Sequence, residues 1–119
     1  MNVNQLTKAE FKRRGWVGEK VEYYITGTRK TKDYFGCIDF IAVDPVHKIV
    51  AGIQSTSGDN HNARVKKVAG IKKIYPWLQA GCILEVWSWK MNISTRRYEM
   101  RRTSFKLSTS GDLLVNDVI

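Results

Sequence analysis

The sequence predicts an α/β domain in which helices pack on a mixed central β-sheet. The chain has 119 residues, enough for one compact domain, and 43% of them are hydrophobic, enough for a core. The hydrophobic pattern changes period along the chain in the order helix, three strands, helix, two strands. No repeat, low-complexity tract or flexible linker interrupts it, so we expect a single domain over residues 1–119.

The first element is a helix over residues 4–14, NQLTKAEFKRR. Its apolar residues Leu6, Ala9 and Phe11 are expected to face inward, and Gly15 is expected to end it.

Three strands are expected next. Residues 20–26 are β-prone, and a basic loop, GTRKTKDYFG, follows them. Residues 37–43 and 49–56 are apolar runs joined by DPVHK, which predicts a hairpin.

The second half begins with a change to helical period. Asp59 or Asn60 can cap this helix, and Pro76 is expected to kink or end it. Two strands follow, over residues 82–91 and 96–107, whereas residues 109–119 give no clear pattern. The apolar positions at helical spacing are Val65, Val68, Ile71, Tyr75 and Leu78.

The charge of the chain favours a nucleic-acid partner. Twenty Lys and Arg residues against eleven Asp and Glu residues give a formal charge of +9, and basic side chains release counterions from phosphates. No apolar run is long enough for a membrane helix, and the N-terminus has no signal-peptide core. Cys37 and Cys82 lie in apolar runs, so we expect reduced core cysteines and a cytoplasmic protein.

Asp39 is the first candidate functional residue, because a carboxylate inside an apolar strand is costly unless something pairs with it. The centre of the hairpin lies near residue 46 or 47, so Asp39 and Gln54 are equidistant from it and are expected to oppose each other. Strand alternation also predicts that Asp39 faces opposite to Ile38 and Phe40. Two oxygen ligands at one point suit Mg²⁺. The alternative is a structural carboxylate that accepts backbone N–H bonds at a strand end.

This arrangement resembles the PD-(D/E)XK nuclease superfamily over roughly residues 4–90. The resemblance rests on a helix ending in a GW turn, a strand, Asp39, about fourteen further residues, and a Gln-x-Thr triplet before a helix. It is similar to the branch of Holliday-junction resolvases and small phage or prophage endonucleases. It implies a restriction-endonuclease-like αβββαβ core and a Mg²⁺- or Mn²⁺-dependent endonuclease that hydrolyses DNA, including branched or structured DNA.

The resemblance also implies roles for individual residues. Asp39 falls at the metal-binding Asp of the family, Gln54 at its Glu, and Thr56 at its Lys. A hydroxyl cannot supply the charge of that Lys, so either a nearby base replaces it or the domain is a catalytically inactive nucleic-acid-binding module.

The helix after Gln54 offers two replacements for the Lys. At 100° per residue, Arg64 lies on the apolar side and can bind the scissile phosphate bidentately. Lys67 lies at the edge of this side. The alternative for Arg64 is an ion pair with Asp59. His61 can shuttle a proton beside the site, or it is an ordinary solvated loop residue.

A third acidic metal ligand has three candidates. The resemblance favours Glu10 on the first helix. Glu22 ranks slightly higher, because a central strand would lie closer to Asp39, and Asp33 is the third option.

DNA is the expected partner, and a homodimer is expected if both strands are cut. Trp87 and Trp89 share one strand face and are expected to fill the core rather than stack on bases. The candidate DNA-binding residues are Arg29, Lys30, Lys32, Arg64, Lys66, Lys67, Arg97 and Arg101.

Overall fold

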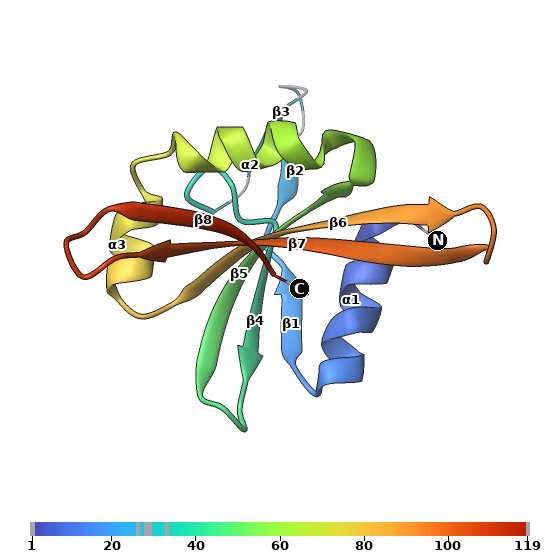
Figure 1. Cartoon of the computed structure of the whole chain (residues 1–119), viewed down its shortest axis with the longest axis horizontal. Helices are drawn as coiled ribbons and strands as arrows, with labels where there is room; N and C mark the ends of the chain where they lie inside the picture. Colours follow the sequence, from blue (N-terminus) through green and yellow to red (C-terminus); the bar gives the residue numbers. More distant parts are fainter. Residues whose placement is uncertain (1, 26, 28–29, 33, 119) are drawn as a thin grey trace.

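Six strands form one mixed sheet in the order β1-β4-β5-β6-β7-β8 (Figure 1). The computed structural model describes residues 2–25, 27, 30–32 and 34–118. The elements are α1 (Val3–Arg14), β1 (Val17–Lys20), β2 (Tyr23–Ile25), β3 (Lys30–Lys32), β4 (Phe40–Asp44), β5 (Ile49–Ser57), the 3₁₀ helix η1 (Gly58–Asn60), α2 (His61–Ala69), α3 (Ile74–Gln79), β6 (Ile83–Asn92), β7 (Arg97–Leu107) and β8 (Leu113–Val118).

The sheet is antiparallel except where β5 and β6 run parallel, and α2 and α3 connect these two strands. The predicted single α/β domain with a mixed sheet is confirmed. The predicted hairpin register is also confirmed, because Phe40 pairs with Ile53, and the next residues outward, Asp39 and Gln54, are joined by a side-chain hydrogen bond of 3.0 Å.

Helix α1 is capped at both ends by residues that favour helix termini. The Asn2 side chain accepts a hydrogen bond from the Gln5 backbone N–H, and the Gln5 side-chain oxygen accepts one from the Asn2 backbone N–H. Gly15 ends the helix in the left-handed conformation, with φ of 76°. The inward face is Leu6, Thr7 and Phe11. The prediction for Ala9 is wrong, because Ala9 is exposed.

The single helix predicted after residue 60 is two helices, which separate at residues 70–73. Pro76 does not end or kink the helix. It lies in the first turn of α3, where the missing N–H would have no partner in any case. Asn60 precedes α2 without a capping side-chain hydrogen bond, and Asp59 lies in η1.

Three strand predictions also need correction. Residues 20–26 are not one strand, because β1 ends at Lys20 and β2 pairs with β3 in a separate two-stranded sheet. β4 begins at Phe40 rather than at Cys37, because residues 34–38 form a turn closed by hydrogen bonds between Tyr34 and Ile38. The unassigned C-terminal segment contains β8, which pairs with β7.

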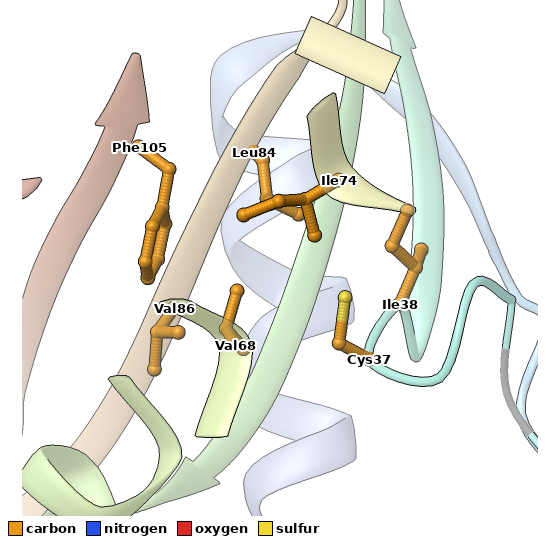
Figure 2. Close-up of a cluster of buried hydrophobic side chains, with 7 residues drawn as sticks. All are labelled: Cys37, Ile38, Val68, Ile74, Leu84, Val86 and Phe105. Carbon is orange, nitrogen blue, oxygen red and sulfur yellow. The ribbon is translucent and has the colours of Figure 1, made fainter. Parts of the chain in front are cut away.

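The hydrophobic core is divided between the two faces of the sheet. Figure 2 shows the cluster under α2 and α3, in which Ile38 and Val86 are packed. The adjacent Trp87 points to the other face, where it contacts Phe11 of α1 with ring centroids 5.3 Å apart. Trp89 packs against this second cluster, so both tryptophans are core residues as predicted.

Cys37 is buried and Cys82 is half-buried, and neither is in a disulfide within the described residues. Within the described residues, the helices are all too short or too polar to span a bilayer.

Candidate metal and phosphate site

The centre of the site is Asp39, at a bend just before β4. Its Oδ2 accepts two hydrogen bonds of 3.0 Å, one from the Gln54 side-chain amide and one from the Ser55 backbone N–H. Its backbone accepts hydrogen bonds from Val21 and Glu22, which draws the end of β1 towards it. The Asp39 carboxylate therefore binds the Ser55 backbone N–H just beyond Phe40 and Ile53, the last pair of β4 and β5.

Asp39 does not face opposite to both of its neighbours, as alternation predicts. Ile38 packs in the cluster under α2 and α3, whereas Phe40 packs in the cluster under α1. The bend at Asp39 rotates the chain and breaks the alternation.

Two oxygen atoms of this pair are buried without a hydrogen-bond partner among the described residues. They are Asp39 Oδ1 and Gln54 Oε1. Asp39 is only 4% exposed and Gln54 only 2%. Because a buried polar atom that makes no hydrogen bond is costly, these oxygens are candidate acceptors for a proton or a water and candidate ligands for a cation.

Glu22 places a second carboxylate beside Asp39. Burial raises the pKa of Asp39 to about 7, and the Glu22 carboxylate adds to this increase, whereas the Ser55 N–H and the Gln54 amide oppose it. Two carboxylates this close repel each other unless a proton or a cation is shared between them.

These residues line one pocket of about 350 Å³, together with Thr56 and Arg64. Thr56 is buried and follows Gln54 on the same face of β5. Arg64 comes from the first turns of α2, and among the described residues its side chain has no ion pair or hydrogen bond. The alternative of an Arg64–Asp59 pair is not observed, because Asp59 pairs with Lys90 at 3.6 Å. Arg64 therefore places an unpaired guanidinium on the wall of a pocket that contains two carboxylates.

Ser55 connects the site to α1, a connection that the sequence analysis missed. Trp89 Nε1–H donates to Thr7 Oγ1 at 3.0 Å, and the Thr7 and Ser55 hydroxyls are 2.7 Å apart. The Ser55 hydroxyl also points to the Val3 carbonyl at 3.4 Å. Because the Ser55 N–H binds Asp39, this chain of hydrogen bonds positions the carboxylate. The only signal in the sequence was Thr7, a small polar residue on the otherwise apolar inward face of α1.

Several predicted site residues lie elsewhere. Glu10 binds Arg13 and Arg14 at 2.6–2.8 Å and does not line the pocket. Lys67 is exposed on α2, also outside the pocket lining. Asp33, the third candidate ligand, lies outside the described residues.

The candidate DNA-binding residues spread over three regions. Arg29 lies outside the described residues, while Lys30 and Lys32 lie in β3. Lys66 is exposed on α2, and Arg97 is exposed on β7. Exposed Arg101 also lies on β7, and it binds Asp117 at 3.1 Å and Asn62 at 3.0 Å.

His61 is neither a pocket residue nor a solvated loop residue. It is completely buried between Ser88 Oγ, 2.6 Å from Nδ1, and Thr103 Oγ1, 2.7 Å from Nε2. Thr103 donates its hydroxyl proton to Asp117, so it must accept from Nε2–H, and Nδ1 accepts from Ser88. These bonds satisfy a neutral imidazole, and they fix α2 on β6 and β7.

The donor set fits a hard divalent cation. Within the described residues there is no group of three or more His, Cys, Asp or Glu side chains that could hold a metal. Mg²⁺, however, is commonly bound by only one or two carboxylates plus waters and substrate phosphate. Asp39, Glu22 and the unpaired Gln54 oxygen supply this kind of partial shell.

Comparison of the chain with protein-family models, with curated proteins and with solved structures finds no match in any of the three.

Proposed function

We propose that this protein is a metal-dependent nuclease that hydrolyses DNA phosphodiester bonds. The observation that carries the proposal is the pair of buried, unpartnered oxygens of Asp39 and Gln54, which lie in one pocket with the Glu22 carboxylate and an unpaired Arg64. Carboxylates that hold a divalent cation beside a guanidinium that binds phosphate are the groups that phosphodiester hydrolysis requires.

The topology supports the same proposal. Helix α1 precedes the antiparallel strands β1, β4 and β5, then α2 and α3 lead to β6, parallel to β5. This element order agrees with the αβββαβ core that the resemblance to PD-(D/E)XK nucleases implies, and so it supports the proposal. β2 and β3 are an insertion between its first two strands, and β7 and β8 extend it.

Four pocket residues, Asp39, Glu22, Gln54 and Arg64, have direct roles in this mechanism. Asp39, Glu22 and Gln54 would hold Mg²⁺ or Mn²⁺, which when bound supplies Lewis acidity and lowers the pKa of a bound water. Arg64 binds the scissile phosphate and stabilises the charge that develops on it. Ser55 and Thr7 hold Asp39 in position.

A binding module without catalysis is the second candidate, and Thr56 is the observation that favours it. Thr56 lies beside Gln54, where the family has its Lys, and carries no charge. The two candidates differ in whether Arg64 substitutes for this Lys.

Cleavage assays test the proposal. Plasmid and four-way-junction DNA are incubated with the protein in Mg²⁺, in Mn²⁺ and in EDTA. We expect cleavage only with a divalent ion, and none by Asp39→Asn. Asp112→Asn is the matched control, because exposed Asp112 lies in the turn between β7 and β8, away from the pocket lining.

Arg64→Gln and Lys67→Gln form a second matched pair, since they remove the same charge from one helix. We expect Arg64→Gln to abolish cleavage and Lys67→Gln to retain most of it. DNA binding without cleavage in every variant and in the parent protein would favour the binding module. The homodimer stays a prediction, to be checked by sedimentation with and without DNA.

A further inference from the structure

The ends of β6 and β7 form a two-stranded arm over residues 90–101. The last β6 residue that pairs with β5 is Trp89, opposite Ser57. The first β7 residue that pairs with β8 is Arg102, opposite Val118. In the part of the chain that the structure describes, the strands beyond these points pair only with each other. Figure 1 shows their turn at the right-hand end of the molecule, beyond α1.

The arm is basic. Its charged residues are Lys90, Arg96, Arg97 and Arg101, against the single acidic residue Glu99. Asn92 already binds Glu99 at 2.8 Å. Arg96 and Arg97 are exposed, and no described side chain forms an ion pair with either. The arm therefore has an excess of cations that the fold does not neutralise.

The tip of the arm is ordered and ends in an apolar residue. Asn92 Oδ1 accepts hydrogen bonds from the backbone of Ser94 and Thr95, and the Asn92 carbonyl accepts one of 2.7 Å from Arg96. This turn holds Ile93 at 87% exposure. An apolar side chain fixed at the end of a basic arm suits contact with a partner.

The arm starts at the rim of the candidate catalytic pocket. Ser57, which lines that pocket, pairs with Trp89, the last residue before the arm. Lys90 then lies 3.6 Å from Asp59 of η1, the segment that leads into α2 and Arg64. A duplex with its scissile phosphate in the pocket would therefore pass next to the arm.

We propose that the arm, residues 90–101, lies in the major groove of duplex DNA, with Ile93 at the groove floor. The proposal rests on the nuclease function proposed above. The major groove admits a two-stranded β-ribbon, and it is about 8.5 Å deep. The step from Lys90 to Ile93 at about 3.3 Å per residue gives roughly 10 Å, which matches this depth. The arginines lie against phosphates at the groove walls, and Ile93 makes apolar contact with thymine methyl groups.

Binding is measured by fluorescence anisotropy in the Asp39→Asn background, so that the DNA stays intact. Adding Arg97→Gln should weaken binding and lower the slope of log K against log salt by about one. Adding Lys72→Gln, which removes the same charge from the segment between α2 and α3, should leave both unchanged. Ile93→Ser should weaken binding several-fold, whereas Val46→Ser, at an equally exposed residue of the β4–β5 turn, should not.

Methylation protection identifies the groove. We expect the Asp39→Asn protein to protect guanine N7, in the major groove, and Ile93→Ser to lose this protection. Protection of adenine N3 alone, which reports the minor groove, would overturn the proposal. So would unchanged affinity in both arm variants, even if the parent protein cuts DNA. An arm-dependent footprint with no cleavage by the parent protein would instead retain the arm and refute the nuclease. Absence of duplex binding would overturn the arm proposal alone, whereas absence of both duplex binding and cleavage by the parent protein would overturn both proposals.

Discussion

Replacing Asp39 with Asn is expected to stabilise the metal-free protein at pH 8. The pKa of Asp39 is raised from 3.8 to about 7, mainly because the carboxylate is buried and partly because Glu22 lies beside it. The folded protein therefore binds this proton more tightly than the unfolded chain does. The resulting stabilisation is complete below pH 3.8 and is lost as the pH rises through 7.

The magnitude follows from the size of the shift. A difference of about three pKa units, at 1.36 kcal/mol per unit, means that ionised Asp39 costs the fold up to about 4 kcal/mol at pH 8. An Asn side chain removes this charge and keeps an oxygen for the Ser55 N–H. Since part of the cost returns when the amide is buried, we expect Asp39→Asn to gain about 2–4 kcal/mol at pH 8 and little at pH 4.

Urea unfolding in EDTA at pH 4 and pH 8 measures this gain, with Asp112→Asn as the control. Adding Mg²⁺ at pH 8 should then stabilise the parent protein by about 2.7 kcal/mol at 100 times its Kd and should leave Asp39→Asn unchanged. The reasoning fails if Asp39→Asn is less stable than the parent at pH 8 in EDTA. It also fails if the variant keeps the full response to Mg²⁺.

Three further predictions concern the groups around the site and the second face of the sheet. Thr7→Val should cost about 1–3 kcal/mol in urea unfolding, because it leaves the Trp89 N–H without its acceptor, and it should also slow cleavage; unchanged stability would show that the hydrogen-bond chain is dispensable. The pKa of His61 is lowered by burial, so His61 should reduce stability as the pH falls below 6.5; the difference between the parent and His61→Gln, measured between pH 7.5 and 5.5, isolates this effect, and a constant difference would contradict it. Arg102→Met should lower the free energy of unfolding by about 3–5 kcal/mol, because the buried Glu85 carboxylate loses its bidentate ion pair with Arg102, at 2.9 and 3.1 Å. Adding Glu85→Gln should recover much of that loss, and strict additivity of the two changes would rule out the coupling.

The hairpin register was predictable from the sequence because it depends on a local turn. Once DPVHK is the turn, the pairing of Phe40 with Ile53 follows, and Asp39 and Gln54 come together. The position of Arg64 followed from helical period in the same way. Patterns of this kind are set by neighbouring residues, so they can be read without the rest of the fold.

The choice between Glu10 and Glu22 could not be made in this way. Glu22 reaches Asp39 because the chain leaves β1 at Lys20 and its next two N–H groups bind the Asp39 carbonyl. Glu10 is held by arginines of its own helix. The position of Glu22 depends on tertiary hydrogen bonds that have no sequence period. The bonds of Glu10, in contrast, are local, to residues three and four positions further along the same helix.

The break between α2 and α3 was missed for a different reason. Pro76 is the stronger helix-breaking signal, at about 3 kcal/mol relative to Ala, whereas Gly70 is the weaker one, at about 1 kcal/mol. In the structure α3 starts at Ile74, two residues before Pro76, and Ile74 is buried in the cluster under α2 and α3. The residue type alone did not distinguish a proline that ends one helix from a proline that begins the next.

The distribution of the site along the chain has a consequence for folding. The residues that would hold the proposed metal come from the link after β1, the bend before β4 and the end of β5. In the sheet β5 lies between β4 and β6, and β6 follows it in the chain only after two helices. No fragment that ends before residue 83 can contain the complete sheet around this pocket. During synthesis, the proposed metal site of Asp39, Glu22 and Gln54 should therefore gain its affinity for a divalent ion only after β6 has left the ribosome. Until its central strands are paired, the chain should have no nuclease activity.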